Sequence, residues 1–506
     1  MWQGRNRRPE RGHRRSTRAL INDEIHHSPA VNPAVGVVDS CVSARDDAAP
    51  RAPSKAAPSK AVPSTSGPST SGASTSENPA GTPLSEEDAE AHVHGICFKT
   101  GPPGQVGVEL EWLVSDQRDP AARVAADRVM QAVAGLTTGN PPAALPGGGT
   151  LSTEPGGQLE LSSAPAPSLG GCVAAAGADL TTLREATQAA GLQLSGHGLD
   201  PLRPPQRVLD LPRYAAMEEF FDRRGPEGRV MMCNTASVQV CVDAGQEGPG
   251  ESGYRSRWRL VHAIGPVLVA AFANSPVQSG RASGWRCTRQ AVWSRLDPGR
   301  TRAPAGALPG AGDVDPRDAW ARYALDAELM CIRRDGNGGW AAPPGLTFRD
   351  WLRGAGDRPP TADDLSYHLT TLFPPVRPHG HLELRMIDAQ PADGWIVPTA
   401  VVSALLDDPK AADAALAATE PLWARSEVAT VQDQKTVEDP WLVAAKHGPS
   451  DSGIDRASRA CFEAADAALG RSSAPATIRH AVAAFAEKYV LRGRCPADDR
   501  LKENSR

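Results

Sequence analysis

The sequence predicts an α+β domain in which an antiparallel sheet carries helices on its apolar face. Four segments alternate polar and apolar residues with a period of two, which is typical of strands buried on one face. Parallel strands, covered on both faces, read instead as continuous apolar runs. Helical patterns separate the four segments and continue through the chain after Trp395. The polar face of this sheet is then the place to look for a site.

The chain of 506 residues begins with a stretch that predicts a disordered low-complexity tail over residues 1–85. Residues 49–80 consist mainly of Ala, Pro, Ser, Thr and Gly, which cannot bury enough apolar surface to offset the loss of chain entropy. A folded domain is expected over residues 86–506, with a helical C-terminal part over about 395–495.

Charge and cysteine content exclude several classes of protein. The net charge is −5, from 54 basic and 59 acidic residues, which gives no bias toward nucleic acid or anionic membranes. The longest apolar run, residues 261–272, is shorter than the roughly 20 residues of a membrane span. Nine cysteines without a CxxC pair argue against a zinc ribbon or a disulfide framework. We expect a cytoplasmic protein with reduced thiols and no nucleic-acid or membrane partner.

The elements follow from the same patterns. Strands are expected at 106–114, 158–162, 234–242 and 381–386, and the clearest helices at 174–190, 252–272, 454–469 and 476–491. His262, inside an apolar helical pattern, is read as a core or helix-surface residue rather than a ligand. The glycine run 147–149 is read as a flexible turn, because it lacks the strand–turn–helix context of a dinucleotide-binding fold.

Carboxylates gather on the predicted polar face, and the strands carry no lysine there. The acidic side chains of the strands and of the turn before the second strand are Glu109, Glu111, Glu154, Glu160 and Glu383. Clustered carboxylates repel one another unless cations neutralise them, and hard oxygen ligands are what Mg²⁺ takes. The pattern therefore predicts a magnesium site that serves nucleotide phosphates. The alternative is a set of solvated glutamates on an exposed face.

Arginines supply the positive charge that phosphate handling needs. The segment 284–295 places Arg286 and Arg289 beside Trp285 and Trp293, and arginine binds carboxylates or phosphates as a bidentate fork. The two tryptophans could wall a small substrate pocket; the alternative is an exposed basic loop with core tryptophans. Arg385 is a candidate for stabilising a transferring phosphoryl group. No GxxxxGK[ST] motif is present, so a P-loop is not expected.

Six segments, in order, resemble the motifs of plant-type glutamate–cysteine ligases. They are TEPGGQLELS (153–162), MMCNTASVQ (231–239), FANSP (272–276), GWRCTRQAVW (284–293), YALD (323–326), and HLTTLFP (368–374) followed by LELR (382–385). The Ala-, Gly-, Pro- and Arg-rich composition is similar to that of the actinobacterial branch that opens ergothioneine biosynthesis.

The resemblance implies a glutamine-synthetase-like catalytic fold, in which a curved antiparallel sheet forms an active-site funnel. It also implies that ATP phosphorylates the γ-carboxylate of glutamate and that the amine of cysteine then displaces phosphate, with Mg²⁺ offsetting charge. The expected partners are the small molecules glutamate, cysteine and ATP, and the expected state is a monomer, with an oligomer left open.

By position, the resemblance assigns roles to individual residues. The implied metal ligands are Glu109, Glu111, Glu154, Glu160, Gln239 and Glu383, of which Glu109, Glu154 and Glu383 would hold the ion nearest the reacting carboxylate. Arg289 would grip the substrate glutamate with support from Trp293, Arg385 would contact the γ-phosphate beside Glu383, and Tyr323 would help to position cysteine.

Cys233 stands where plant-type members carry an arginine. This leaves the contact with the α-carboxylate of glutamate open, and Arg286 could supply it. No redox switch is predicted, because the plant cysteine pair cannot be placed here.

Three other functions remain open. The first is a related ATP-dependent carboxylate–amine ligase with another amine acceptor. The second is a guanidino phosphotransferase, although such enzymes bind nucleotide phosphates mainly through arginines. The third is a non-catalytic homologue, which the intact Glu, Gln and Arg residues at the motif positions disfavour.

Overall fold

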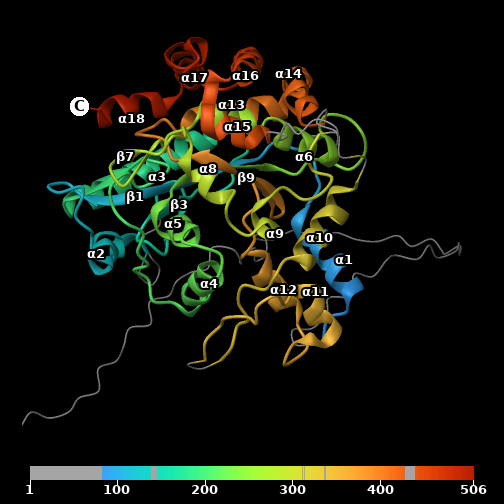
Figure 1. The fold of residues 1–506 in the computed structure, drawn as a ribbon. Coiled ribbons are helices and arrows are strands. Elements are labelled where there is room, and N and C mark those ends of the chain that lie inside the picture. Colours follow the sequence, from blue (N-terminus) through green and yellow to red (C-terminus); the bar gives the residue numbers. More distant parts are fainter. Residues whose placement is uncertain are drawn as a thin grey trace, which may run out of the picture. The chain divides into compact units, whose positions relative to one another are not determined.

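The four predicted strands form the centre of one antiparallel sheet, to which short strands add. The computed structural model describes residues 83–137, 145–309, 312, 314–335, 338–427 and 439–505. Its main sheet consists of β1 (Val106–Asp116), β2 (Thr150–Thr153), β3 (Leu159–Ser162), β4 (Leu192–Ser195), β5 (Ser237–Asp243), β8 (Val376–Pro378) and β9 (His381–Asp388). The order is β2-β3-β1-β5-β9-β8, with β4 also paired to β1. Figure 1 labels β1, β3 and β9 of this sheet. Every pairing is antiparallel, so the predicted α+β class is confirmed.

Helices alternate with the strands in the sequence and make up most of the described chain after β9. The first group is α1 (Glu86–Cys97), α2 (Ala126–Thr137), α3 (Leu169–Ala189), α4 (Pro212–Asp222), α5 (Glu227–Asn234), α6 (Tyr254–Ala263), α7 (Gly265–Ala271), α8 (Thr288–Trp293) and α9 (Pro298–Thr301). The second is α10 (Pro316–Asp326), α11 (Phe348–Asp350), α12 (Ala362–Leu369), α13 (Ile396–Asp407), α14 (Pro409–Glu427), α15 (Pro440–His447), α16 (Ser452–Arg471), α17 (Ala476–Lys488) and α18 (Pro496–Asn504). A small hairpin, β6 (Val277–Gln278) with β7 (Arg281–Ala282), stands apart from the main sheet.

The apolar face of the sheet is covered by helices, as the alternation predicts. Val108, Leu110 and Trp112 of β1 are buried, and so are the alternate apolar residues of β5 and β9. Helix α3 packs against β1, α7 against β9 and α13 against β5. Because burial of apolar side chains is the main favourable term in folding, this face fixes the sheet and leaves the other face for polar residues.

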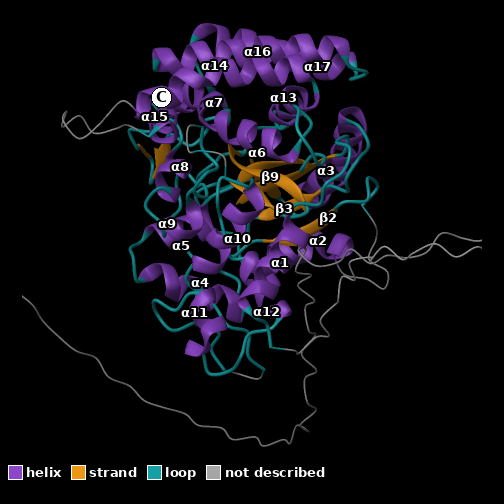
Figure 2. Ribbon diagram, turned by 90° about the vertical axis from the view of Figure 1, so that its right-hand side faces the viewer, coloured by secondary structure: helices purple, strands orange, loops and turns teal. Residues whose placement is uncertain are grey.

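The predicted helical C-terminal region forms two layers over that face. Helix α13 lies next to the sheet, and α14, α16 and α17 pack on its far side (Figure 2). Helix α18 lies elsewhere, against the β6–β7 hairpin. No helix in the described ranges is both long and apolar enough to cross a membrane.

Several predicted elements differ in their bounds, and two of these differences have a clear cause. The helix predicted at 252–272 is two helices, α6 and α7, because Pro266 has no N–H for an interior helical hydrogen bond and instead lies in the first turn of α7. The strand predicted from 234 begins at Ser237, because Asn234 still belongs to α5. The predicted tail lies almost entirely outside the described residues, which begin at Pro83.

Candidate active site

The register of the sheet brings the predicted polar residues of four strands onto one face. Glu109 of β1 lies directly opposite Gln239 of β5, and Glu111 lies opposite Glu160 of β3. Glu383 of β9 lies opposite Cys241, two residues along β5 from Gln239. Residues opposite each other in register share a face, so these side chains lie together although they are far apart in the sequence.

Glu154 reaches the same region from the tight turn between β2 and β3. The turn closes through the Glu154 N–H, which donates to the Gln158 carbonyl oxygen at 2.8 Å. Gln158 Nε2 donates to the Thr235 carbonyl oxygen at 3.0 Å and so ties the turn to the start of β5. Gly156 is required here because a Cβ atom would overlap the backbone of Cys233 at the end of α5. The motif residues around Glu154 therefore hold the turn in place.

The polar face is not an open, solvated surface. Glu160 is 8 % exposed and Glu383 is 1 % exposed, while Glu109, Glu111 and Glu154 are partly buried. Burying a carboxylate is costly unless it is paired or neutralised. The alternative of solvated glutamates on an exposed face therefore does not hold for Glu160 and Glu383.

A chain of hydrogen bonds crosses this face. Arg377 of β8 donates to Glu383 through Nε at 2.8 Å to Oε2 and through Nη2 at 3.0 Å to Oε1. Arg385 Nη1 donates both to Glu383 Oε1 and to Gln239 Oε1. Gln239 Nε2 donates in turn to Glu111 Oε1 at 2.8 Å. The chain thus connects β8, β9, β5 and β1, and Arg385 occupies its centre.

The carboxylates fall into two electrostatic classes. Desolvation, together with Glu383, raises the pKa of Glu109 to about 8, and desolvation with Glu111 raises the pKa of Glu154 to about 7. Desolvation and the neighbouring glutamates also raise the pKa of Glu160 well above its ordinary value. Burial alone would raise the pKa of Glu383, but Arg377 and Arg385 hold it below the ordinary range. The negative charge of Glu383 is therefore balanced by two arginines, whereas Glu109, Glu154 and Glu160 lack enough nearby positive charge.

The donor chemistry fits Mg²⁺. In the ranges that the structure describes, no three His, Cys, Asp or Glu side chains gather closely enough to form a complete metal site. Mg²⁺ commonly takes one or two carboxylates and completes its shell with water and substrate phosphates, so an open set of under-neutralised carboxylates suits it. The roles of Glu109, Glu111, Glu154, Glu160, Gln239 and Glu383 as metal ligands stay predictions.

Arg289 lies beside this face, in the first turn of α8. Its side chain is 3 % exposed, its guanidinium carbon lies 4.6 Å from the centre of the Trp293 ring, and its Nη2 donates to the backbone oxygen of Arg385 at 2.8 Å. The Nε atoms of Arg289 and Arg385 are buried and have no hydrogen-bond partner among the described residues. Arg289 is thus joined to the strand that carries Glu383 and Arg385, and two buried arginines at this place suit an anionic substrate.

The family model for glutamate–cysteine ligase family 2 (GCS2) matches residues 105–505, a range that contains all of these residues. The chain belongs to glutamate–cysteine ligase family 2. It is therefore a ligase.

Bacterial and chloroplastic ligases are similar to this chain. Glutamate–cysteine ligase EgtA of Mycobacterium tuberculosis is 38 % identical over 428 residues, which cover 83 % of this chain and 91 % of that protein. EgtA of Mycolicibacterium smegmatis is 39 % identical over 422 residues, covering 82 % and 90 %. The chloroplastic glutamate–cysteine ligase of Brassica juncea is 33 % identical over 251 residues, covering 48 % and 46 %.

Three predicted substrate residues of this ligase lie outside the hydrogen-bonded chain. Arg286 forms an ion pair with Asp498 of α18 at 3.1 Å, and Trp285 is partly buried against the main core. The Tyr323 ring stacks on Trp320 with ring centres 5.2 Å apart. Its hydroxyl is buried and has no partner among the described residues. Their contacts with substrate stay predictions.

Two arginines of the site were missed from the sequence. Arg377 lies opposite Glu383 across the turn at His379–Gly380, and the short alternating segment 376–378 before this turn was a usable signal. Arg213 of α4 opposes the rise in the pKa of Glu154 and donates to Thr370 Oγ1 at 2.8 Å. No local pattern connects Arg213 with the strands, since it arrives from a helix outside the sheet.

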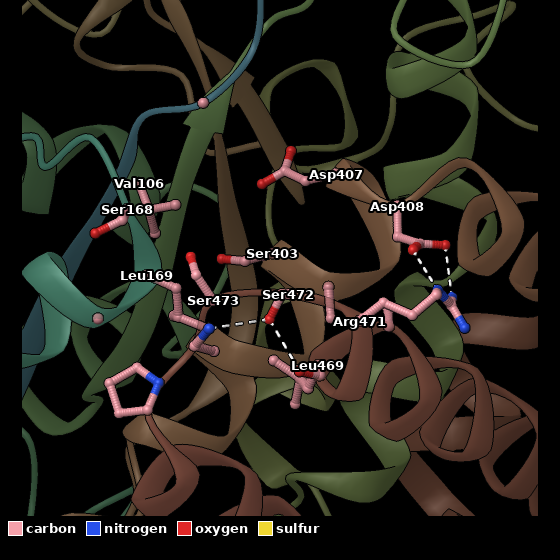
Figure 3. Close-up of a pocket in the computed structure, with 16 residues that line it drawn as sticks. Val106, Ser168, Leu169, Ser403, Asp407, Asp408, Leu469, Arg471, Ser472 and Ser473 are labelled. Carbon is pink, nitrogen blue, oxygen red and sulfur yellow. Dashed lines mark hydrogen bonds and ion pairs between the residues drawn. The ribbon is translucent and has the colours of Figure 1, made fainter.

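A cavity of about 560 Å³ lies away from these residues (Figure 3). It is formed by the start of β1, the start of α3, the ends of α13 and α16, and the segment before α17, and Asp408 and Arg471 form an ion pair at its edge at 2.8 Å. None of the predicted site residues lines it. It takes no part in the chemistry considered for the carboxylate face.

Proposed function

We propose that this ligase joins the γ-carboxylate of L-glutamate to the amine of L-cysteine, using ATP and releasing ADP and phosphate. One observation carries the proposal. Carboxylates that lack enough nearby positive charge share one partly buried sheet face with Arg385, and Arg289 is bonded to Arg385 beside them. Negative and positive groups side by side suit a reaction between two anions, a nucleotide and a carboxylate.

The chemistry requires that two negatively charged groups approach each other. The γ-carboxylate of glutamate attacks the γ-phosphorus of ATP, which gives γ-glutamyl phosphate and ADP. The amine of cysteine then attacks the activated carbonyl carbon, phosphate leaves, and the amine loses a proton as the amide forms. Arg385, at the centre of the hydrogen-bonded chain, would contact the transferring phosphoryl group, and Arg289 would hold the glutamate.

Mg²⁺ would supply charge neutralisation between the phosphates and the carboxylates. Glu109, Glu154 and Glu160 are suited to hold it, because their raised pKa values report a shortage of positive charge. Glu111 and Gln239 lie next to them through the hydrogen bond that they share. Glu383 would act first by fixing Arg385, since both of its oxygens already accept hydrogen bonds from arginines.

A role in ergothioneine biosynthesis belongs to the same proposal. Its support is the likeness to the two EgtA ligases, which extends over about nine-tenths of each of those proteins.

Trapping of the acyl phosphate tests the mechanism. Purified protein is incubated with Mg-ATP, L-glutamate and hydroxylamine in the absence of cysteine, and γ-glutamyl hydroxamate is measured. The proposal expects hydroxamate in proportion to ADP. ADP without hydroxamate would contradict an acyl phosphate intermediate, and no ADP with any amine would favour a non-catalytic homologue.

A further inference from the structure

We propose that Asp388, at the end of β9, positions Arg289 for binding of the substrate carboxylate. This inference rests on the proposed function of Arg289. Asp388 is 1 % exposed and accepts three hydrogen bonds. Its Oδ2 accepts from the Asn274 N–H at 2.8 Å and from the Ser275 hydroxyl at 2.7 Å, and its Oδ1 accepts from the Cys287 thiol at 3.2 Å.

Each of the two side chains bound to Asp388 is in turn bonded to the first turn of α8. Ser275 Oγ accepts from the backbone N–H of Arg289 at 3.2 Å, and Cys287 Sγ accepts from the backbone N–H of Gln290 at 3.4 Å. Helix α8 has only six residues, too few to hold itself in place through its own hydrogen bonds. Its orientation therefore depends on outside contacts, which include packing against α5 and α15, and two of its backbone N–H groups are joined in this way to one carboxylate.

The side chain of Arg289 is fixed by the same strand. Its Nη2 donates to the backbone oxygen of Arg385, three residues before Asp388 on β9. Strand β9 thus holds Arg289 at two points. The backbone oxygen of Arg385 holds its guanidinium, and Asp388 holds its backbone N–H through the Ser275 hydroxyl. The three direct donors to Asp388 are neutral groups. Burial raises the pKa of Asp388, and the positive charge of Arg289 is the main influence that opposes this rise.

The carboxylate has little room to move. A Cβ atom at Gly198 would overlap Asp388 Cγ, so the backbone of residue 198 closes one side of the carboxylate. The side chain of Asp388 is therefore held by packing as well as by hydrogen bonds, as a positioning group must be.

The test replaces Asp388 by Asn, which keeps the size and can still accept from Asn274 and Ser275. We expect Asp388→Asn to raise KM for L-glutamate about tenfold, because a misplaced Arg289 loses part of one charged hydrogen bond to the substrate carboxylate. KM for ATP and KM for cysteine should not change. Ser275→Ala, which removes only the hydroxyl between Asp388 and Arg289, should raise the same KM by a smaller factor. This second variant keeps the test available if Asp388→Asn does not fold.

Asp364→Asn is the matched control. Like Asp388, Asp364 is buried and accepts hydrogen bonds from a backbone N–H and a hydroxyl. Unlike Asp388, it also accepts from Arg358, and its role is to cap α12. It should lower Tm without changing KM for glutamate. Equal losses of Tm in both Asp variants, with KM for glutamate unchanged, would show that Asp388 is purely structural and would overturn the proposal.

A crystal structure of Asp388→Asn separates this inference from the proposed function. A guanidinium of Arg289 displaced from Trp293 supports positioning whatever the substrate is, and an unmoved one overturns it. Absence of glutamate turnover by the unsubstituted protein would instead contradict the proposed function alone.

Discussion

Arg377 donates to both oxygens of Glu383, at 2.8 Å from Nε and at 3.0 Å from Nη2, from the position directly opposite on the neighbouring strand. Both side chains are largely buried. The pair matters because Arg385 shares the same carboxylate, so the orientation of Arg385 depends on how Glu383 is held.

Replacing Arg377 by Gln should therefore destabilise the protein and slow turnover. Removal of one partner leaves a buried, under-neutralised carboxylate, which costs about 3–5 kcal/mol. Urea unfolding measures the loss, and Arg471→Gln is the control, since the more exposed Arg471–Asp408 pair is screened by solvent and should contribute far less to stability. Equal stabilities of the two variants would contradict the account of Glu383.

The raised pKa of Glu109 predicts a pH-dependent stability. Between the ordinary glutamate pKa and about 8, the folded protein retains a proton on Glu109 that the unfolded chain has lost, so stability falls as the pH rises through this range. Glu109→Gln should show a shallower fall of Tm between pH 6 and pH 8 than the unsubstituted protein. Mg-ATP should flatten the same curve, because metal binds the deprotonated carboxylates. Parallel curves for the two proteins would count against the electrostatic reading of the site.

Arg286 and Arg289, three residues apart, should behave differently. Arg289→Gln removes a predicted charged contact with glutamate, worth about 2 kcal/mol, and should raise KM for glutamate about 30-fold. Arg286→Gln breaks the pair with Asp498 and should lower Tm slightly while leaving that KM within about twofold. Steady-state kinetics and thermal unfolding of both variants decide the matter. A large rise of KM in Arg286→Gln would restore Arg286 as a substrate ligand.

Tyr323→Phe tests the predicted cysteine contact. The hydroxyl of Tyr323 is buried and has no partner among the described residues, so its removal leaves no orphaned protein group. If the hydroxyl binds cysteine, KM for cysteine rises about fivefold while KM for glutamate and Tm stay the same. An unchanged KM for cysteine would assign Tyr323 to packing against Trp320 only.

The sheet face could be predicted from the sequence because period-two alternation is local. Counting along single strands put Glu109 and Glu111 on one face of β1 and Glu160 on the polar face of β3, whereas the register that pairs Glu111 with Glu160 was not predicted. Pro266 was a usable signal for the break between α6 and α7, but the apolar pattern on both sides of it led to the prediction of one continuous helix.

Other features could not be predicted because they depend on contacts between distant segments. Arg213 lies on α4, and its effect on Glu154 depends on how that helix docks. The pairing of Arg286 with Asp498 needs the position of α18, which no pattern near residue 286 reveals. Asp388 lies beyond the strand predicted at 381–386 and was given no role, because its three donors come from residues more than a hundred positions earlier.

The most direct test is ADP release by the purified protein with Mg-ATP and L-glutamate, with and without L-cysteine, together with the mass of the product. The account predicts cysteine-dependent ADP release and γ-glutamylcysteine, and loss of both in Glu109→Gln. Release of ADP only with another amine would place the chain among other carboxylate–amine ligases, and full activity of Glu109→Gln would contradict the proposed role of the carboxylate face.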